Sequence, residues 1–229
     1  MAVSLVAVGV RGHPGLGSDG MTTHGLSFAA PADESEELAR AELYGLLANL
    51  WLAPPDAALL EQFKVAVTQA PEAGGWLEAP WQALVAALRD TTPQAAAEEH
   101  EALFHGVGKA EVFPYGSFYL AGFLNEKPLA ALRTDLAALG LTREIDALET
   151  EDHVAYLLEV MRWLIAGDDV AICNLEQQRR FFRAHLQPWV GQLCDAVQAH
   201  PRSVLWHAVA GFTREFMLVE TQAFDMLEA

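Results

Sequence analysis

The stretch that decides the fold is residues 150–167, with the sequence TEDHVAYLLEVMRWLIAG. Its apolar residues recur at intervals of three and four, which is the pattern of an amphipathic helix with one buried face. These positions are Val154, Leu157, Leu158, Met161, Leu164 and Ile165. We expect Thr150 to cap the start of this helix and Gly167 to end it.

The same helical character extends in both directions from this stretch. From Glu34 onward, good helix formers dominate the sequence, and Pro or Gly residues separate the segments. Thr92 followed by Pro93 is a favoured helix start. Neither a run of period-two alternation nor a hairpin dipeptide indicates a strand. The sequence therefore predicts an all-α, single-domain bundle of about ten helices, at roughly 36–51, 56–69, 80–89, 92–105, 114–124, 128–140, 150–167, 171–186, 188–199 and 203 to the C-terminus.

The N-terminal segment differs in composition from the rest of the chain. Residues 1–32 hold six of the 17 glycines, a single Arg and a single Asp, so we expect a flexible tail followed by an all-helical domain at 33–229. Met21 is an alternative start within this tail. Residues 1–10 are apolar but are followed, not preceded, by Arg11, which is the wrong order for a secretory signal.

Charge and cysteine content limit the possible classes of function. The 14 basic and 31 acidic residues give a net charge of −17, which disfavours binding to nucleic acid or to an anionic membrane surface and suits a partner carrying Arg or Lys. We expect Cys173 and Cys194 to be reduced and structural, as in a cytoplasmic protein. No window reaches the roughly 18 uncharged apolar residues of a membrane span, so no stable membrane insertion is expected.

Motifs of known enzymes and metal sites are incomplete in this chain. His100 and His105 lie five residues apart, whereas zinc-binding histidines on a helix lie four apart; in an α-helix the two rings should point about 140° away from each other. Residues 106–109, GVGK, lack the flanking Gly and Ser or Thr of a phosphate-binding loop. We therefore expect no catalytic residue, no metal and no cofactor, and we keep a nucleotide-binding protein that uses residues 106–109 as an alternative.

Two segments stand out. The first combines aromatic residues with Gly and Pro at residues 101–120; these aromatics either form a recognition surface or fill the core under a loop. The second is residues 149–153, ETEDH, at the start of a helix. Its carboxylates either interact with the helix dipole or hold the guanidinium of a bound peptide. Both interpretations remain open for both segments.

Together these segments resemble the TorD/DmsD family. The matching residues, in order, are Glu101, Leu103 and Phe104, then Pro114-Tyr115-Gly116-Ser117-x-Tyr119-Leu120, then Leu139-Gly140, then Glu149-x-Glu151-Asp152-His153. The similarity extends from about Glu36 to the last helix. This chain departs from the family where Glu151 replaces a proline and where Tyr115 replaces the tryptophan of some relatives.

The resemblance implies a cytoplasmic chaperone without catalytic activity. Such proteins bind the twin-arginine signal peptide, and part of the apo form, of a molybdopterin oxidoreductase until its cofactor is loaded, and then permit export. The residues to which peptide binding carries over are Leu103, Phe104, Tyr115, Asp152, His153 and, more loosely, Tyr44. Monomer and domain-swapped dimer both remain open. The alternatives are a chaperone of a non-exported molybdoenzyme of the nitrate-reductase branch and a helical scaffold for another folded protein.

Overall fold

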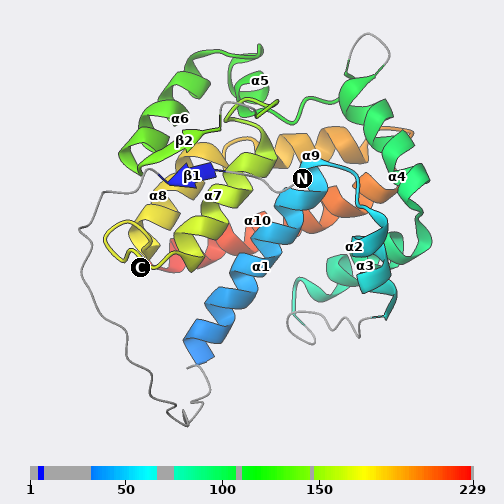
Figure 1. Cartoon of the computed structure of the whole chain (residues 1–229), viewed down its shortest axis with the longest axis horizontal. Coiled ribbons are helices and arrows are strands. Elements are labelled where there is room, and N and C mark those ends of the chain that lie inside the picture. Colours follow the sequence, from blue (N-terminus) through cyan, green and yellow to red (C-terminus); the bar gives the residue numbers. More distant parts are fainter. Residues whose placement is uncertain (1–4, 8–31, 66–74, 107–109, 145–146, 228–229) are drawn as a thin grey trace, which may run out of the picture.

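The computed structural model describes residues 5–7, 32–65, 75–106, 110–144 and 147–227. Within these ranges the chain forms ten α-helices, one π-helical turn and two short strands (Figure 1). They are β1 (Leu5–Ala7), α1 (Ala32–Leu52), α2 (Ala57–Val65), α3 (Glu78–Asp90), α4 (Pro93–His100), η1 (Glu101–His105), α5 (Gly116–Ala121), α6 (Lys127–Ala138), β2 (Leu141–Arg143), α7 (Val154–Ala166), α8 (Leu175–His185), α9 (Val190–Gln198) and α10 (Leu205–Met226). The predicted all-α bundle of about ten helices is confirmed.

Helices α1, α7 and α10 form the centre of the bundle. The apolar α7 packs against α1, and α10 packs against α3 and α9 (Figure 1). Gly45 permits the close approach of α1 to α7, because a Cβ at this position would lie 2.8 Å from Cδ of Arg162. The largest fully buried side chains are aromatic, among them Trp51, Trp189 and Trp206. Burial of this apolar surface is the main force that stabilises the bundle.

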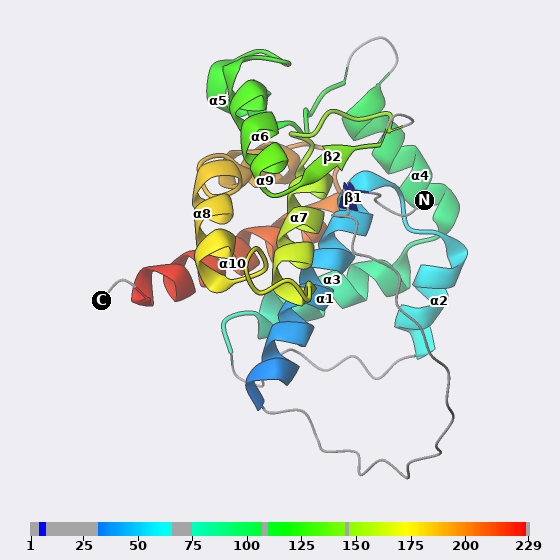
Figure 2. The ribbon, with the colours of Figure 1, turned by 60° about the vertical axis from the view of Figure 1, so that its left-hand side comes forward.

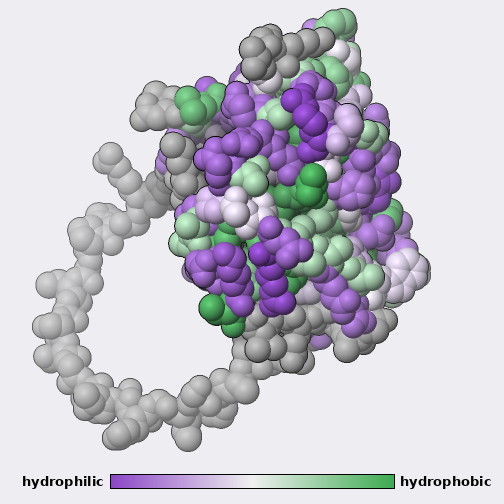
Figure 3. Space-filling model, turned by 90° about the vertical axis from the view of Figure 1, so that its right-hand side faces the viewer, coloured by the Kyte–Doolittle hydropathy of each residue, from purple (hydrophilic) through white to green (hydrophobic). Residues whose placement is uncertain are grey.

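Two groups of helices flank this centre on opposite sides. Helices α2, α3 and α4 lie on one side, and α5, α6 and α8 lie on the other (Figures 1 and 2). The face over α2–α4 is largely hydrophilic, with a small hydrophobic area near its middle (Figure 3). Among the helices in the described ranges, none is long and apolar enough to cross a membrane.

The prediction that the chain contains no strand is wrong. β1 and β2 pair in antiparallel orientation, with Val6 opposite Thr142. Each strand has three residues, which is too few for period-two alternation to be recognised in the sequence. β1 falls within the predicted flexible tail. Most of the rest of that tail lies outside the described residues, so the division at residues 32 and 33 stays a prediction.

The start of α7 also differs from the prediction, whereas the start of α4 does not. Thr92 caps α4 as expected by accepting from the Ala95 N–H at 3.2 Å. Thr150 does not cap α7; the cap is His153, whose Nδ1 accepts from the Ala155 N–H. Glu151 and Asp152 consequently lie in the turn before α7 and not in its first helical turn.

Candidate functional site

Two of the sequence motifs meet in space. We call residues 114–117 and 149–154 the motif junction. Tyr115 and His153 form an isolated antiparallel β-bridge. The Gly116 N–H donates to the Asp152 carbonyl, and the Val154 N–H donates to the Pro114 carbonyl, both at 2.9 Å. The structure therefore brings Tyr115, Asp152 and His153 together, although more than 30 residues separate the two motifs.

Asp152 is buried at the motif junction and is fully engaged within the chain. Its side-chain Oδ2 accepts from the Ser117 N–H at 2.9 Å, and its Oδ1 accepts from the Thr150 hydroxyl at 2.6 Å. Only 3% of Asp152 is exposed. Because this carboxylate is buried and is held from both sides, an incoming guanidinium would reach it only if the junction opened. In this arrangement Asp152 holds the start of α5 against the turn before α7.

His153 is buried beside Asp152 and is uncharged. Its Nδ1 accepts from the Ala155 N–H at 3.2 Å, which places the ring proton on Nε2. The ring packs edge-on against Tyr115 at a centroid distance of 5.1 Å. Burial, followed by the charges of His100 and His105, lowers the pKa of His153 to about 3. His153 therefore orients α7 and Tyr115 as a neutral ring.

Two carboxylates at the rim of the junction bind groups from other segments. The Tyr115 hydroxyl donates to the Glu149 carboxylate, and burial together with this carboxylate raises the pKa of Tyr115. Glu151 accepts from Arg133 of α6 at 3.0 and 2.9 Å. Burial opposes ionisation of Glu151, but Arg133 and Arg143 outweigh it and lower its pKa. Glu151 thus ties the junction to α6.

Leu103 and Phe104 belong to the core. Leu103 is fully buried, and its carbonyl accepts from the Val112 N–H at 2.9 Å. The Phe104 ring lies 5.9 Å from that of Trp51 and 5.8 Å from that of Trp206. These two residues support the loop from below, so their contact with a peptide stays a prediction.

The two histidines of this region lie together, contrary to the prediction. Residues 101–105 form a π-helical turn in which the Gly106 N–H donates to the Glu101 carbonyl at 2.7 Å. A π-turn holds an additional residue, so His100 and His105 face the same side, with ring centroids 5.2 Å apart. Burial and the charge of His105 lower the pKa of His100 to about 4. In the described part of the chain, no three His, Cys, Asp or Glu residues are arranged to hold a metal ion. Most of the GVGK segment, residues 107–109, lies outside the described residues.

Tyr44 lies away from the motif junction. It is fully buried in α1, and its hydroxyl donates to Oε2 of Glu220 in α10 at 2.7 Å. Glu220 also accepts from Arg40 at 2.8 and 2.7 Å. The structure gives Tyr44 a partner within the chain and does not bring it to the other predicted site residues.

An apolar cavity of about 210 Å³ opens beside the motif junction, between α5, α6, α7, α8 and Trp189, the residue before α9. We call it the motif cavity. Gly116 leaves room for the Trp189 ring in its wall, since a Cβ at Gly116 would lie 3.1 Å from that ring. Most of its lining is apolar, with two carboxylates and one histidine: Gly116, Ser117, Leu120, Pro128, Ala131, Leu132, Asp135, Asp152, Leu157, Ala184, His185 and Trp189.

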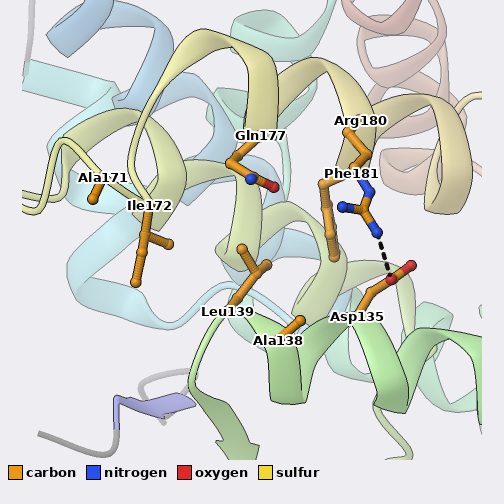
Figure 4. Close-up of a pocket in the computed structure, with 8 residues that line it drawn as sticks. All are labelled: Asp135, Ala138, Leu139, Ala171, Ile172, Gln177, Arg180 and Phe181. Atoms are coloured by element: carbon orange, nitrogen blue, oxygen red, sulfur yellow. Dashed lines mark hydrogen bonds and ion pairs between the residues drawn. The ribbon is translucent and has the colours of Figure 1, made fainter. Parts of the chain in front are cut away.

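Asp135 is a site residue that the sequence did not reveal. It lies on α6 and accepts from two residues of α8, Arg180 Nη2 at 3.2 Å and His185 Nε2 at 2.8 Å. Asp135 also lines a second cavity of about 200 Å³, the Ile172 cavity, at one end of which it meets Arg180 (Figure 4). The other residues of this lining are Ala138, Leu139, Ala171, Ile172, Gln177 and Phe181. Asp135 therefore borders both cavities.

Larger cavities lie elsewhere in the described part of the chain. One of about 610 Å³, the α1–α10 cavity, is lined by Arg40, Glu220 and the exposed Trp76 among others. Another, of about 660 Å³, lies between α3, α4 and the start of α10. Neither is lined by a residue of the six predicted for peptide binding. The motif cavity is smaller, but it is bordered directly by Asp152 and Gly116.

Known proteins resemble this chain over most of its length. "Chaperone protein TorD" of Aliivibrio fischeri is 25% identical over 201 residues, which cover 80% of this chain and 93% of that protein. "Chaperone protein YcdY" of Escherichia coli K12 is 24% identical over 171 residues, which cover 74% of this chain and 87% of that protein. A solved structure described as a redox enzyme maturation protein, from Archaeoglobus fulgidus, matches with a TM-score of 0.49 and 18% identity, covering 86% of this chain and 99% of that one.

The sequence profile of the family described as "Nitrate reductase delta subunit" matches residues 72–195. This range holds more than half of the chain and includes Leu103, Phe104, the motif junction and Asp135; Tyr44 lies before it. The chain belongs to the nitrate reductase delta subunit family.

Proposed function

We propose that this protein is a cytoplasmic chaperone, without catalytic activity, for a molybdopterin oxidoreductase. It binds the twin-arginine signal peptide and the apo form of that enzyme until the cofactor is loaded, and then permits export. The two curated relatives, both chaperones, support this proposal. The observation that carries it is the motif cavity, an apolar cavity bordered by two carboxylates at the point where the two family motifs meet.

The chemistry of a twin-arginine leader is complementary to this cavity. Such a leader offers two guanidinium groups and then an apolar run. The apolar run would bind as in helix-in-groove recognition. Burial of about 400 Å² of apolar peptide surface would contribute roughly 10 kcal/mol, and association and ordering costs remove at least about 4 kcal/mol of this. At most about 6 kcal/mol remains, which corresponds to a dissociation constant of tens of micromolar or weaker and suits a chaperone that must release its client.

The net charge of −17 favours the encounter with such a peptide. Long-range attraction raises the association rate of a basic peptide, and salt screens this attraction beyond about 8–10 Å. The contribution of charge is therefore mainly kinetic, and the affinity depends on the cavity.

Isothermal titration calorimetry with a synthetic leader tests this proposal. The probe is the twin-arginine leader of a molybdoenzyme encoded next to the gene, and its control is the same peptide with both arginines replaced by citrulline, which is uncharged but similar in shape. We expect the leader to bind with a dissociation constant of tens of micromolar, and the citrulline peptide to bind about tenfold more weakly. Absence of heat with every twin-arginine leader of the same genome would contradict the proposal.

A second candidate is a chaperone of a non-exported molybdoenzyme. The description of the matching family, "Nitrate reductase delta subunit", favours it. In that case the N-terminal peptide of a molybdoenzyme catalytic subunit that lacks an arginine pair would bind more tightly than any twin-arginine leader. The same titration distinguishes the two candidates.

A further inference from the structure

Two aspartates border the motif cavity, and their surroundings differ. Asp152 is 3% exposed, and both of its oxygens are held by the start of α5 and by Thr150. The Asp135 side chain is 31% exposed and meets α8 at the boundary of both cavities. Of the two carboxylates, Asp135 is therefore the one that an external cation can reach without unfolding the junction.

Asp135 already binds a guanidinium of this chain. Arg180 Nη2 lies 3.2 Å from Oδ1, and the Arg180 side chain is 63% exposed (Figure 4). A pair with this much exposure contributes little to stability, because water and salt compete with it. Arg180 is for this reason held only weakly at Asp135, and a second guanidinium can replace it.

His185 prepares Asp135 for this exchange. Its Nε2 lies 2.8 Å from the other carboxylate oxygen, Oδ2. Because a carboxylate accepts only, the ring donates from Nε2 and orients Asp135 without a charge of its own being needed. Arg180 and a peptide guanidinium would therefore compete for Oδ1.

We propose that the Asp135 carboxylate binds an arginine guanidinium of an incoming apolar peptide, and that Arg180 occupies this position until the peptide displaces it. This inference rests on the function proposed above and names the residue that binds an arginine of the leader. The apolar part of the peptide then lies against the linings of the motif cavity and the Ile172 cavity. Displacement of Arg180 leaves His185 as the partner that Asp135 keeps in α8.

A double-mutant cycle between protein and peptide tests the inference. Asp135→Asn keeps the shape of the side chain and removes its charge. We expect this variant to bind the twin-arginine leader about tenfold more weakly than the wild type, and to bind the citrulline peptide with wild-type affinity. Arg180→Gln removes the internal competitor, so it should bind the leader about two- to fivefold more tightly.

A second Asp–Arg pair that joins two helices provides control variants with the same changes of charge. Asp195 and Arg214 form an ion pair between α9 and α10, and neither residue lines the motif cavity or the Ile172 cavity. Asp195→Asn and Arg214→Gln should leave leader affinity within about twofold of the wild type. Far-UV circular dichroism and unfolding midpoints establish that each variant is folded.

The outcomes separate this inference from the proposed function. If the wild type discriminates leader from citrulline peptide but Asp135→Asn discriminates equally well, Asp135 does not read the arginine and the proposed function stands. If Asp135→Asn and Asp195→Asn weaken binding equally, the effect is one of net charge and the inference is wrong. If the wild type binds neither peptide, both the inference and the proposed function are wrong.

Discussion

Two pairs of helices in this bundle are each bridged by an ion pair between an arginine and a carboxylate, and the two ion pairs differ in burial. Between α1 and α10, the Arg40 side chain is 17% exposed and that of Glu220 is 4% exposed, and Tyr44 donates to the same carboxylate. Between α6 and α8, the Arg180 and Asp135 side chains are 63% and 31% exposed, and cavities lie on both sides. The first bridge also borders a cavity, the α1–α10 cavity, but its carboxylate is almost fully buried and is held by Tyr44 as well. The first bridge is therefore structural, and the second can exchange its arginine for another.

Removal of the buried arginine should produce the largest effect. Arg40→Met leaves Glu220 as an uncompensated buried charge, so we expect the free energy of unfolding to fall by about 3–5 kcal/mol. Arg180→Met at the exposed bridge should cost less than about 1 kcal/mol. Urea denaturation followed by circular dichroism measures both. Similar losses of unfolding free energy in the two variants would contradict the comparison.

The protein should lose stability in acid because His100 and His153 are buried. The folded-state pKa of His100 is lowered to about 4 and that of His153 to about 3. Below the ordinary pKa of about 6.5, the unfolded chain therefore binds more protons than the folded chain, and stability falls as the pH falls. Between pH 7 and pH 5, each histidine should cost about 2 kcal/mol.

Variants of these histidines isolate the effect. His153→Asn keeps a helix-capping side chain and removes the titration, so its unfolding free energy should change about 2 kcal/mol less between pH 7 and pH 5 than that of the wild type. His207 is exposed on α10 and provides a control. An equal flattening in His207→Asn would show that His100 and His153 are not responsible.

The two aspartates of the motif cavity should differ in their contribution to the free energy of unfolding, by a smaller amount than the two arginines. Asp152→Asn weakens charge-assisted bonds from Ser117 and Thr150 at a buried site, so we expect a loss of about 1–3 kcal/mol. Asp135→Asn should cost less than about 1 kcal/mol, because its arginine partner is exposed and the Asn oxygen can still accept from His185 Nε2. Thermal unfolding of both variants measures the difference. Equal stability losses would remove the basis for distinguishing a positioning carboxylate from a binding one.

Local patterns predicted the helices, because each pattern lies within one segment. The stripe from Val154 to Ile165 predicted α7, and the Thr92-Pro93 pair predicted the start of α4. Three details failed. His153 rather than Thr150 caps α7, and a π-helical turn brings His100 and His105 to the same side. Each strand has only three residues, which is too few for alternation to be recognised in the sequence.

The candidate site was predicted only in part. The motifs gave Tyr115, Asp152 and His153, which do meet, but no local pattern showed that Asp152 would be buried and engaged. Asp135 has no sequence signal, because an acid within an amphipathic helix resembles any solvated residue. Its partners lie 45 and 50 residues further along the chain. Only the packing of α6 against α8 reveals that it borders two cavities.

The most direct test of the central claim is where a bound leader lies. A twin-arginine leader with benzoylphenylalanine in its apolar run can be photo-crosslinked to the protein, and the crosslinked peptides can be identified by mass spectrometry. We expect crosslinks in residues 116–139 and 171–189, which line the motif cavity and the Ile172 cavity. Crosslinks confined to residues 36–43, 75–77 and 216–222, which line the larger α1–α10 cavity, would contradict the claim.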